Sequence, residues 1–165
     1  MDINTERLLF SRLSPGDFPL YASLATNEDV MKYITGNALT MNEAEQRFQK
    51  ALEQSGKNPD AGVFIVRNKD DGEFIGISKL ILLQKNQAEV GYMLLPECWG
   101  KGFASEMVKC MLDLNRKKSI ATEIIGIVDP ENPASIRVLT KFGFTLYETG
   151  QIDGLAAAYY KLEIA

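Results

Sequence analysis

The sequence predicts an α+β fold, in which a single domain contains a mixed, mostly antiparallel sheet flanked by helices. Three observations support this prediction. Residues 61–67 and 73–82 read as strands separated by a stretch that ends in Asp-Gly, which is typical of a hairpin turn. Residues 88–128 read as strand, helix and strand, the order of a parallel crossover. A length of 165 residues suits one domain, residues 1–165, with a sizeable core.

The N-terminal part is predicted to contain one strand followed by helices. Side chains of residues 8–12 alternate between two faces, as in a strand. The Ser-Pro-Gly-Asp segment at residues 14–17 is typical of a helix start, so we expect a helix over residues 18–26 and a further turn up to Ile34.

A capping box predicts the start of the next helix. The Thr40 side chain can accept a hydrogen bond from the Glu43 N–H, while the Glu43 side chain reaches back to Thr40. We expect this helix to run to about residue 54 and to be followed by a polar loop over residues 55–60. In the strand that comes later, Gly76 indicates a bulge or a close approach of two backbones.

The C-terminal part is predicted to add three strands and a helix. Residues 123–128 are almost continuously apolar, which is typical of a buried strand. A helix follows from about Pro133 and ends at Gly143. Residues 144–148 and 157–163 are expected to form a final hairpin.

The most informative segment joins a strand to a helix through two glycines. Residues 89–95 form the strand, which ends before Pro96. After Gly102, apolar residues recur at three- and four-residue spacing, which indicates a helix. Gly100 and Gly102 allow positive φ and close approach of a ligand. Because the first turn of a helix has unpaired N–H groups and a partial positive charge, an anion such as a diphosphate fits there.

This turn matches neither of the common phosphate-binding motifs. It lacks the spacing and the final Gly-Lys-Ser/Thr of a P-loop, and it contains no G-x-G-x-x-G. A tight turn between a strand and a helix, with nothing bound, is the alternative interpretation.

Composition and charge exclude several classes of function. A net charge of −4 argues against general nucleic-acid binding, and an acidic surface suits a cationic amine substrate. The two cysteines, Cys98 and Cys110, lack metal-site spacing and no histidine is present, so we expect reduced thiols and no metal site. We see no signal sequence and no membrane-spanning window, so we expect a cytoplasmic protein without membrane partners.

The glycine turn resembles the acetyl-coenzyme A binding core of the GNAT N-acetyltransferase superfamily, and more closely its RimJ/RimL-like branch. The family signature, Gln/Arg-x-x-Gly-x-Gly/Ala, falls on residues 99–104. Trp99 replaces the usual Gln or Arg, as is common in that branch. The segments TERLLFSRL and EDVMKYITG near the N-terminus are also similar to the branch. The resemblance implies a GNAT-like fold and an acetyl-coenzyme A cosubstrate.

The resemblance also implies where the cosubstrate lies. The strand before the turn is expected to pair with the pantetheine amides as an added strand would, with the Leu94 N–H polarising the thioester carbonyl. The turn amides would hold the diphosphate, and Lys101 would add charge. The expected cofactor-binding residues are Met93, Leu94, Leu95, Trp99, Gly100, Lys101, Gly102, Phe103, Ala104, Asn132 and Ser135. In the family, the N-terminal helix-loop region walls the acceptor pocket, so Tyr33 and Ile34 are candidates for substrate contact.

Glu89 is the first candidate for the general base. Without histidine, a carboxylate or an ordered water must accept the proton of the amine. Glu89 shares a strand face with Gly91 and Met93, and GNAT enzymes often place a catalytic Glu on this strand. An exposed carboxylate or an ion-pair partner is the alternative interpretation.

The segment from Asn132 to Phe144 resembles the family's N-x-x-S…K-x-G-F pattern. By this resemblance, Asn132 binds the pantetheine arm and Ser135 lies near the sulfur. Many family members carry a Tyr, as general acid, five residues before the final Phe, but this chain has Leu139 there. Ser135, or release of the thiolate to solvent, must replace that acid. Without the resemblance, Asn132 and Ser135 read as helix-start residues.

The sequence therefore predicts an acetyl-coenzyme A dependent N-acetyltransferase that acts by direct transfer in a ternary complex. The acceptor is a primary amine, either a protein N-terminus or a small molecule, and the sequence does not choose between them. A catalytically silent acyl-coenzyme A binding module is the alternative function. Both a monomer and a homodimer are compatible with the sequence.

Overall fold

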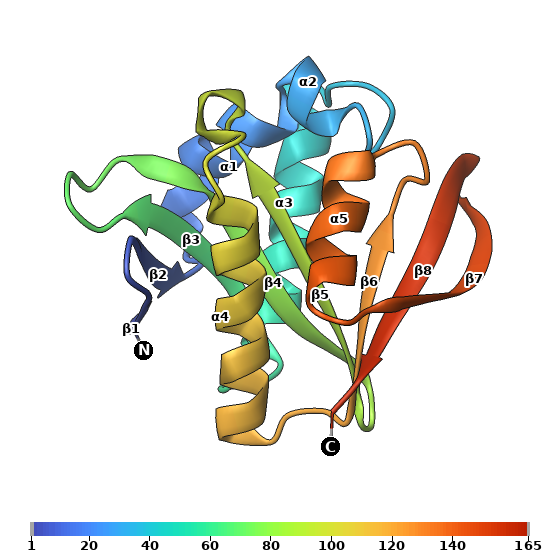
Figure 1. The fold of residues 1–165 in the computed structure, drawn as a ribbon. Coiled ribbons are helices and arrows are strands. Elements are labelled where there is room, and N and C mark those ends of the chain that lie inside the picture. The colour runs from blue at the N-terminus through green and yellow to red at the C-terminus, as the bar shows by residue number, and fades with distance from the viewer. Residues whose placement is uncertain (1, 165) are drawn as a thin grey trace.

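An eight-stranded sheet forms the centre of the protein in a computed structural model that describes residues 2–164 (Figure 1). The strands are β1 (Asp2–Asn4), β2 (Leu8–Arg12), β3 (Gly62–Asn68), β4 (Phe74–Gln84), β5 (Gln87–Leu94), β6 (Glu123–Val128), β7 (Thr145–Ile152) and β8 (Leu155–Glu163). Their order in the sheet is β1-β2-β3-β4-β5-β6-β8-β7. Of the neighbouring pairs, β5 and β6 are parallel and the others are antiparallel, which confirms the predicted mixed sheet.

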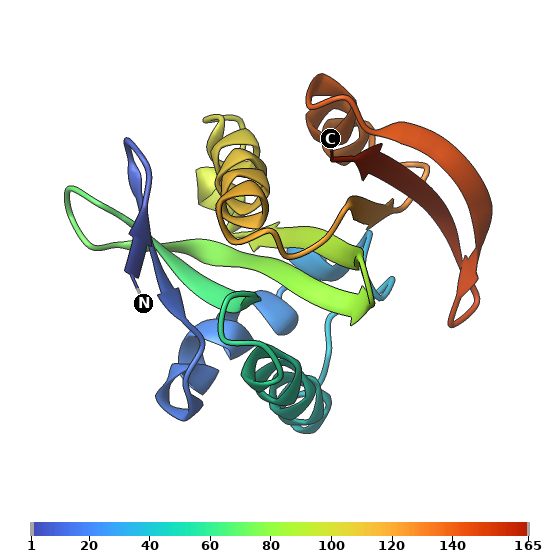
Figure 2. The same ribbon diagram turned by 90° about the horizontal axis from the view of Figure 1, so that it is seen from below.

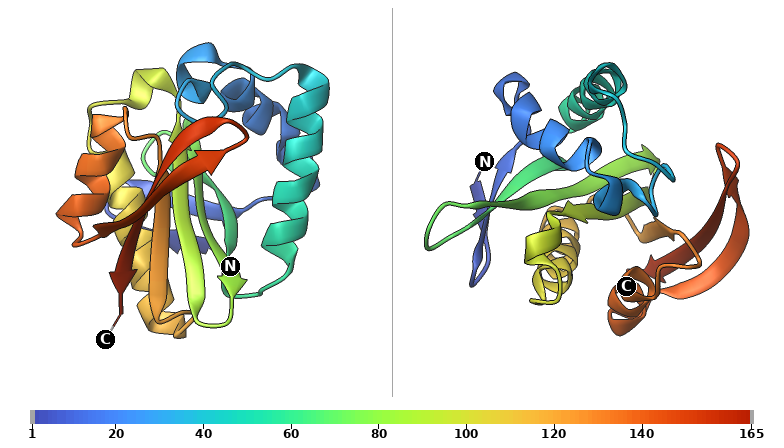
Figure 3. Two further views of the ribbon diagram at one scale, coloured as in Figure 1. Left: turned by 90° about the vertical axis from the view of Figure 1, so that its right-hand side faces the viewer. Right: turned by 90° about the horizontal axis from the view of Figure 1, so that it is seen from above.

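Helices cover both faces of the sheet. They are α1 (Phe18–Ala25), α2 (Glu28–Met31), α3 (Met41–Gly56), α4 (Phe103–Lys118) and α5 (Pro133–Lys141). Figure 2 shows α4 and α5 on one face and α1 to α3 on the other. The β7–β8 hairpin curves away from the rest of the sheet (Figure 3). None of the helices in the described chain combines the length and apolarity needed to span a membrane.

The sheet is buried on both faces because its central strands supply apolar side chains to each. Along β3, Phe64 and Val66 belong to the core under α4, whereas Val63 and Ile65 belong to the core under α1 and α3. Alternation of side chains along a strand therefore explains why this segment reads as continuously apolar.

Local signals in the sequence predicted most element boundaries. The capping box is present, with the Glu43 N–H donating to Thr40 Oγ1 at 3.1 Å and the Thr40 N–H donating to Glu43 Oε1 at 2.9 Å. Gly76 is a site of close approach, because a Cβ there would overlap the carbonyl oxygen of Met93. Several boundaries differ from the prediction by one or two residues; β5, for example, begins at Gln87 and not at Glu89. The α3 helix continues to Gly56, where the buried Ser55 hydroxyl accepts a hydrogen bond from the Val63 N–H.

The final hairpin is longer than predicted, and β1 was not predicted. Strands β7 and β8 extend to a two-residue turn at Asp153 and Gly154, both of which have positive φ. An Asp-Gly pair is a strong hairpin signal, so the sequence did contain the information for this turn. Strand β1 is short and exists through its pairing with β2, which a local pattern does not reveal.

The N-terminal segment is fastened to the start of α4. The Glu106 carboxylate accepts hydrogen bonds from the Arg7 N–H, Arg7 Nε and the Thr5 hydroxyl. Arg7 Nη1 also donates to the carbonyl oxygen of Lys101 at 2.9 Å, and its guanidinium lies 4.4 Å from the ring centroid of Phe103. We call this set of contacts the Arg7–Glu106 clip. It holds the turn before α4 from the side of β2.

A buried asparagine holds the other end of α4. Asn115 is 1% exposed, and its side chain bonds both backbone groups of Ala121, at 3.0 Å to the carbonyl oxygen and 2.9 Å from the N–H. The Asn115 amide therefore ties the end of α4 to the loop that leads into β6.

We predict that Asn115→Ala lowers the free energy of unfolding by about 2–4 kcal/mol, because two buried backbone groups lose their partners. Denaturant unfolding followed by circular dichroism measures the change. Lys117→Ala, on the exposed side of the same helix, is the control and should change stability little. An Asn115→Ala protein as stable as this control would show that the two bonds are not needed.

We predict a pH-dependent effect of Glu106→Gln. Partial burial raises the pKa of Glu106, but its hydrogen bonds and the charge of Arg7 outweigh burial and hold the pKa below its ordinary value of 4.5. The carboxylate therefore stabilises the fold above that pH, and this stabilisation is lost as the pH falls through the pKa of the folded state. At neutral pH, Glu106→Gln should cost about 1.5–3 kcal/mol.

The difference between wild type and Glu106→Gln should narrow as the pH is lowered below 4.5. Asp113→Asn, which removes an exposed carboxylate from the same helix, should have a small effect throughout. A Glu106→Gln difference that does not change with pH would contradict the assignment of the stabilisation to an ionised clip.

Candidate active site

The two parallel strands separate after a short contact. Strands β5 and β6 pair only from Gln87 to Glu89, opposite Glu123 to Ile125. Beyond that point they diverge around a cavity of about 1010 Å³. Its lining includes Val108 of α4 on one face of the sheet and Ala51 of α3 on the other. The cavity therefore passes through the sheet at the gap between these strands.

At the end of β5, some backbone groups bond β4 and others face the gap. The Leu95 N–H donates to the Ile75 carbonyl of β4 at 3.0 Å, so it is not free for a ligand. Because backbone groups alternate in direction along a strand, the N–H of Leu94 turns away from β4 and towards the gap. The Leu94 carbonyl accepts a hydrogen bond from the Trp99 indole at 3.1 Å. Of Met93, Leu94 and Leu95, which were expected to pair with a ligand, Leu94 therefore has the N–H that is directed towards the gap.

The glycine turn has the backbone conformation that the sequence indicated. Gly100 and Gly102 have φ of 73° and 81°, and Gly102 is the N-cap of α4. Gly102, Phe103 and Ala104 line the cavity, so the free N–H groups of the first helical turn border it. The turn is held by the Trp99 indole on one side and by the Arg7–Glu106 clip on the other.

A hydroxyl pair faces the cavity from the α4 and α5 side. The Tyr92 hydroxyl lies 2.9 Å from Ser135 Oγ, which also accepts a hydrogen bond from Asn132 Nδ2 at 3.1 Å. Burial raises the pKa of Tyr92, and the bond to Ser135 offsets this rise only in part. The phenol therefore stays protonated near neutral pH. Leu139 packs against Gly126 of β6 and contributes no polar group.

The candidate base lies on the opposite face of β5. Glu89 lines the cavity and forms an ion pair with Lys79 of β4, with Lys79 Nζ 3.1 Å from Glu89 Oε2. The Lys79 stem crosses Gly91, where a Cβ would lie 2.6 Å from Lys79 Cε. Glu89 is thus both the ion-pair partner that one interpretation expected and a carboxylate at the cavity. Gly91 provides the space for the lysine.

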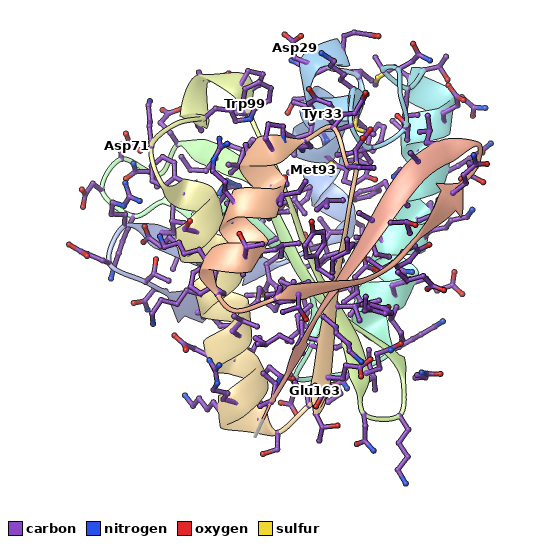
Figure 4. The ribbon with its side chains drawn as sticks, turned by 45° about the vertical axis from the view of Figure 1, so that its right-hand side comes forward. Asp29, Tyr33, Asp71, Met93, Trp99 and Glu163 are labelled. Atoms are coloured by element: carbon purple, nitrogen blue, oxygen red, sulfur yellow. The ribbon has the colours of Figure 1, made fainter. Side chains whose placement is uncertain are left out.

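The N-terminal helices and the final hairpin border the cavity on the side of Glu89. Tyr33 and Ile34, after α2, line it, and so do Ile152 and Leu155 of the hairpin. Figure 4 shows Tyr33, Asp29, Met93 and Trp99 at one end of the molecule, with Glu163 at the other.

Nearly all residues expected at a site share this cavity. Those that line it are Tyr33, Ile34, Glu89, Met93, Leu94, Trp99, Gly100, Gly102, Phe103, Ala104, Asn132 and Ser135. Leu95 and Lys101 do not belong to the lining: Leu95 packs between the two cores, and the Lys101 side chain is exposed. Within residues 2–164, no cluster of three His, Cys, Asp or Glu side chains is arranged to hold a metal ion.

Sequence reasoning missed Tyr92, Lys79 and Arg7. The register of the β4–β5 hairpin pairs Lys79 with Gly91, which brings the lysine diagonal to Glu89, so a correct register could have identified the ion pair. No local signal connects Tyr92 with Ser135 or Arg7 with Glu106, because these partners lie far apart in the chain.

The chain is similar in sequence to known acetyltransferases. The family model described as an acetyltransferase (GNAT) domain matches residues 7–145. The chain is 31% identical over 144 residues to YnaD of Bacillus subtilis (strain 168), described as an uncharacterized N-acetyltransferase, covering 87% of this chain and 82% of the relative.

Solved acetyltransferases have the same fold. The RimL ribosomal L7/L12 alpha-N-protein acetyltransferase, in complex with coenzyme A, superposes with a TM-score of 0.83 at 15% identity, covering 99% of this chain and 98% of that one. Spermidine N-acetyltransferase from Vibrio cholerae, in complex with coenzyme A and spermine, gives 0.78 at 22% identity, covering 96% of each chain. Because the family model spans most of the sequence and a relative described as an N-acetyltransferase is 31% identical over 87% of it, the chain belongs to the GNAT family of N-acetyltransferases.

Proposed function

We propose that the protein transfers an acetyl group from acetyl-coenzyme A to a primary amine, by direct transfer within a ternary complex. The observation that carries this proposal is the cavity that passes through the sheet where β5 and β6 separate. It allows a donor to enter on the α4 side and an amine to enter on the α3 side, so that the two meet in the gap.

The α4 side suits the cosubstrate. The free N–H groups that follow Gly102 and the positive end of α4 would hold the diphosphate. The open edge of β5 would pair with the pantetheine arm, and the Leu94 amide would donate to the thioester carbonyl. Asn132 and Ser135 line the cavity beyond this edge. The coenzyme A present in the two solved acetyltransferases supports the choice of cosubstrate.

The proposed chemistry needs one base and one proton donor. As the amine nitrogen attacks the thioester carbonyl carbon, a C–N bond forms, the C–S bond breaks and the electron pair of that bond leaves on sulfur. The Glu89 carboxylate, directly or through a water, accepts the proton that the nitrogen loses. The Tyr92–Ser135 hydroxyl pair supplies a proton to the sulfur and is restored from solvent. These hydroxyls replace the acid that Leu139 cannot provide.

We predict that Gly102→Ala weakens binding of coenzyme A by about tenfold, because an L-residue resists positive φ and the turn amides shift. Isothermal calorimetry measures the affinity. Gly72→Ala is the matched control, since Gly72 also has positive φ, at 75°, but lies in the distant β3–β4 turn. Acetyl-pantetheine, which lacks the diphosphate, should bind both variants equally. An unchanged affinity of Gly102→Ala for coenzyme A would remove the turn as the diphosphate site.

We predict that Glu89→Gln lowers kcat by about 100-fold or more, because the amine loses its proton acceptor. Thiol release from acetyl-coenzyme A with a panel of amines measures turnover, and calorimetry should show unchanged binding of coenzyme A. Glu123→Gln is the control, because Glu123 is also a strand carboxylate near a lysine, Lys161, but lies outside the cavity.

Wild-type kcat in Glu89→Gln would exclude Glu89 as the base. If wild-type protein binds coenzyme A but turns over no amine, the protein is a silent acyl-coenzyme A binding module instead.

A further inference from the structure

The α3 side of the cavity carries a surplus of positive side chains. Arg47, Lys50 and Gln54 are spaced three and four residues apart, so they share one face of α3, and all three line the cavity. The sheet contributes Lys79 and Glu89 on the same side.

Two of these cations are not neutralised by the protein itself. Lys79 is paired with Glu89, but neither Arg47 nor Lys50 forms an ion pair anywhere in the described chain. Asp29 of α2 also lines the cavity and pairs with neither of them. Because the whole protein has a net charge of −4, this positive surplus is a local property of the cavity and not a consequence of composition.

The cosubstrate does not account for these cations. The glycine turn and the start of α4 lie on one face of the sheet, whereas α3 lies on the other (Figure 2). A diphosphate held by the amides after Gly102 is therefore separated from Arg47 and Lys50 by the sheet. Arg47 and Lys50 are therefore not placed to bind that diphosphate.

Arg47 is supported next to an aromatic cluster. The rings of Phe18 and Tyr21 each lie 5.4 Å from that of Phe48, centroid to centroid. Tyr21 is buried at the edge of the cavity. Burial raises its pKa, while the positive charge of the adjacent Arg47 works in the opposite direction. The phenol therefore stays neutral and does not balance the charge of the guanidinium, which, like the Lys50 ammonium, is exposed to solvent at the mouth of the cavity.

The outer wall limits the size of the acceptor. Ile152 and Leu155, at the tip of the β7–β8 hairpin, line the cavity. Leu155 also reaches the loop after α2, because a Cβ on Gly36 would lie 3.5 Å from Leu155 Cδ2. The hairpin tip and the α2 loop thus meet beside the acceptor side, which favours a small molecule over a protein chain.

We propose that the acceptor is a small amine that carries a carboxylate, of the amino-acid class. Arg47 and Lys50 bind the carboxylate, and the amine points towards Glu89. A guanidinium suits this task because its planar donors match a carboxylate. The same two positive charges disfavour a polyamine, because like charges repel. This inference rests on the proposed acetyl transfer and specifies its acceptor.

Matched acceptor pairs test the inference. Thiol release from acetyl-coenzyme A is measured for amino acids, including β-alanine and glutamate, and for the corresponding compounds in which each carboxylate is an amide. Spermidine and short peptides with a free N-terminus and an amidated C-terminus complete the panel. The inference expects kcat/KM to be about tenfold or more higher for the best carboxylate than for its amide partner.

Variants then locate the selectivity. Arg47→Gln and Lys50→Gln should each raise KM for the carboxylate acceptor. The ratio of kcat/KM for the carboxylate acceptor to kcat/KM for its amide partner should then fall towards one. Arg47→Glu should reverse the preference. Lys57→Gln, which removes a positive charge at the end of the same helix but outside this cavity, is the control and should keep the wild-type ratio.

Each unfavourable outcome has a distinct meaning. Faster turnover of spermidine, of a peptide or of the amides would overturn the inference and leave acetyl transfer intact. An Arg47→Gln protein that keeps the full carboxylate preference would also overturn it. Failure to turn over any amine, whatever its charge, would overturn the proposed acetyl transfer and the inference together.

Discussion

The separation of β5 from β6 is the constraint on which the rest of the structure depends. A parallel pair needs a crossover connection, and here α4 makes that connection. The strands remain paired only over Gln87–Glu89, so the backbone of β5 beyond this point has no strand partner on that side. Polar backbone groups that lack a partner must meet water or a ligand. The divergence of the strands thus creates the cavity and also leaves unpaired backbone N–H groups of β5 along its edge.

Different polar side chains border this gap on the two faces of the sheet. Alternation along β5 sends Tyr92 to the α4 side, where Ser135 meets it, and sends Glu89 to the α3 side, where Lys79 meets it. A phenol and a carboxylate from one strand, the proposed proton donor and proton acceptor, therefore lie on opposite sides of the same opening. This arrangement suits a reaction in which one group leaves as another arrives.

The first residues of the chain contribute to the site from a distance. Glu106 would place a negative charge in the helix turn that is proposed to hold a diphosphate. Arg7 neutralises this charge and also bonds the carbonyl oxygen of Lys101. The clip would thereby remove a local repulsion, and it fixes the turn whose amides are proposed to bind the anion. The segment between β1 and β2 is consequently part of the support of the turn, although it contributes no residue to the cavity.

The sequence by itself determined the features that depend on neighbours within three or four residues. These include the capping box at Thr40, the start of α4 after Gly102 and the two glycines that permit positive φ in the turn. Most of the cavity residues could be assigned because a family resemblance added to these signals. Only the tertiary structure decided which groups meet: Tyr92 with Ser135, Arg7 with Glu106, and the Leu95 amide with Ile75. Such contacts join residues distant in the chain, and strand register and helix packing, which no short pattern encodes, set their geometry.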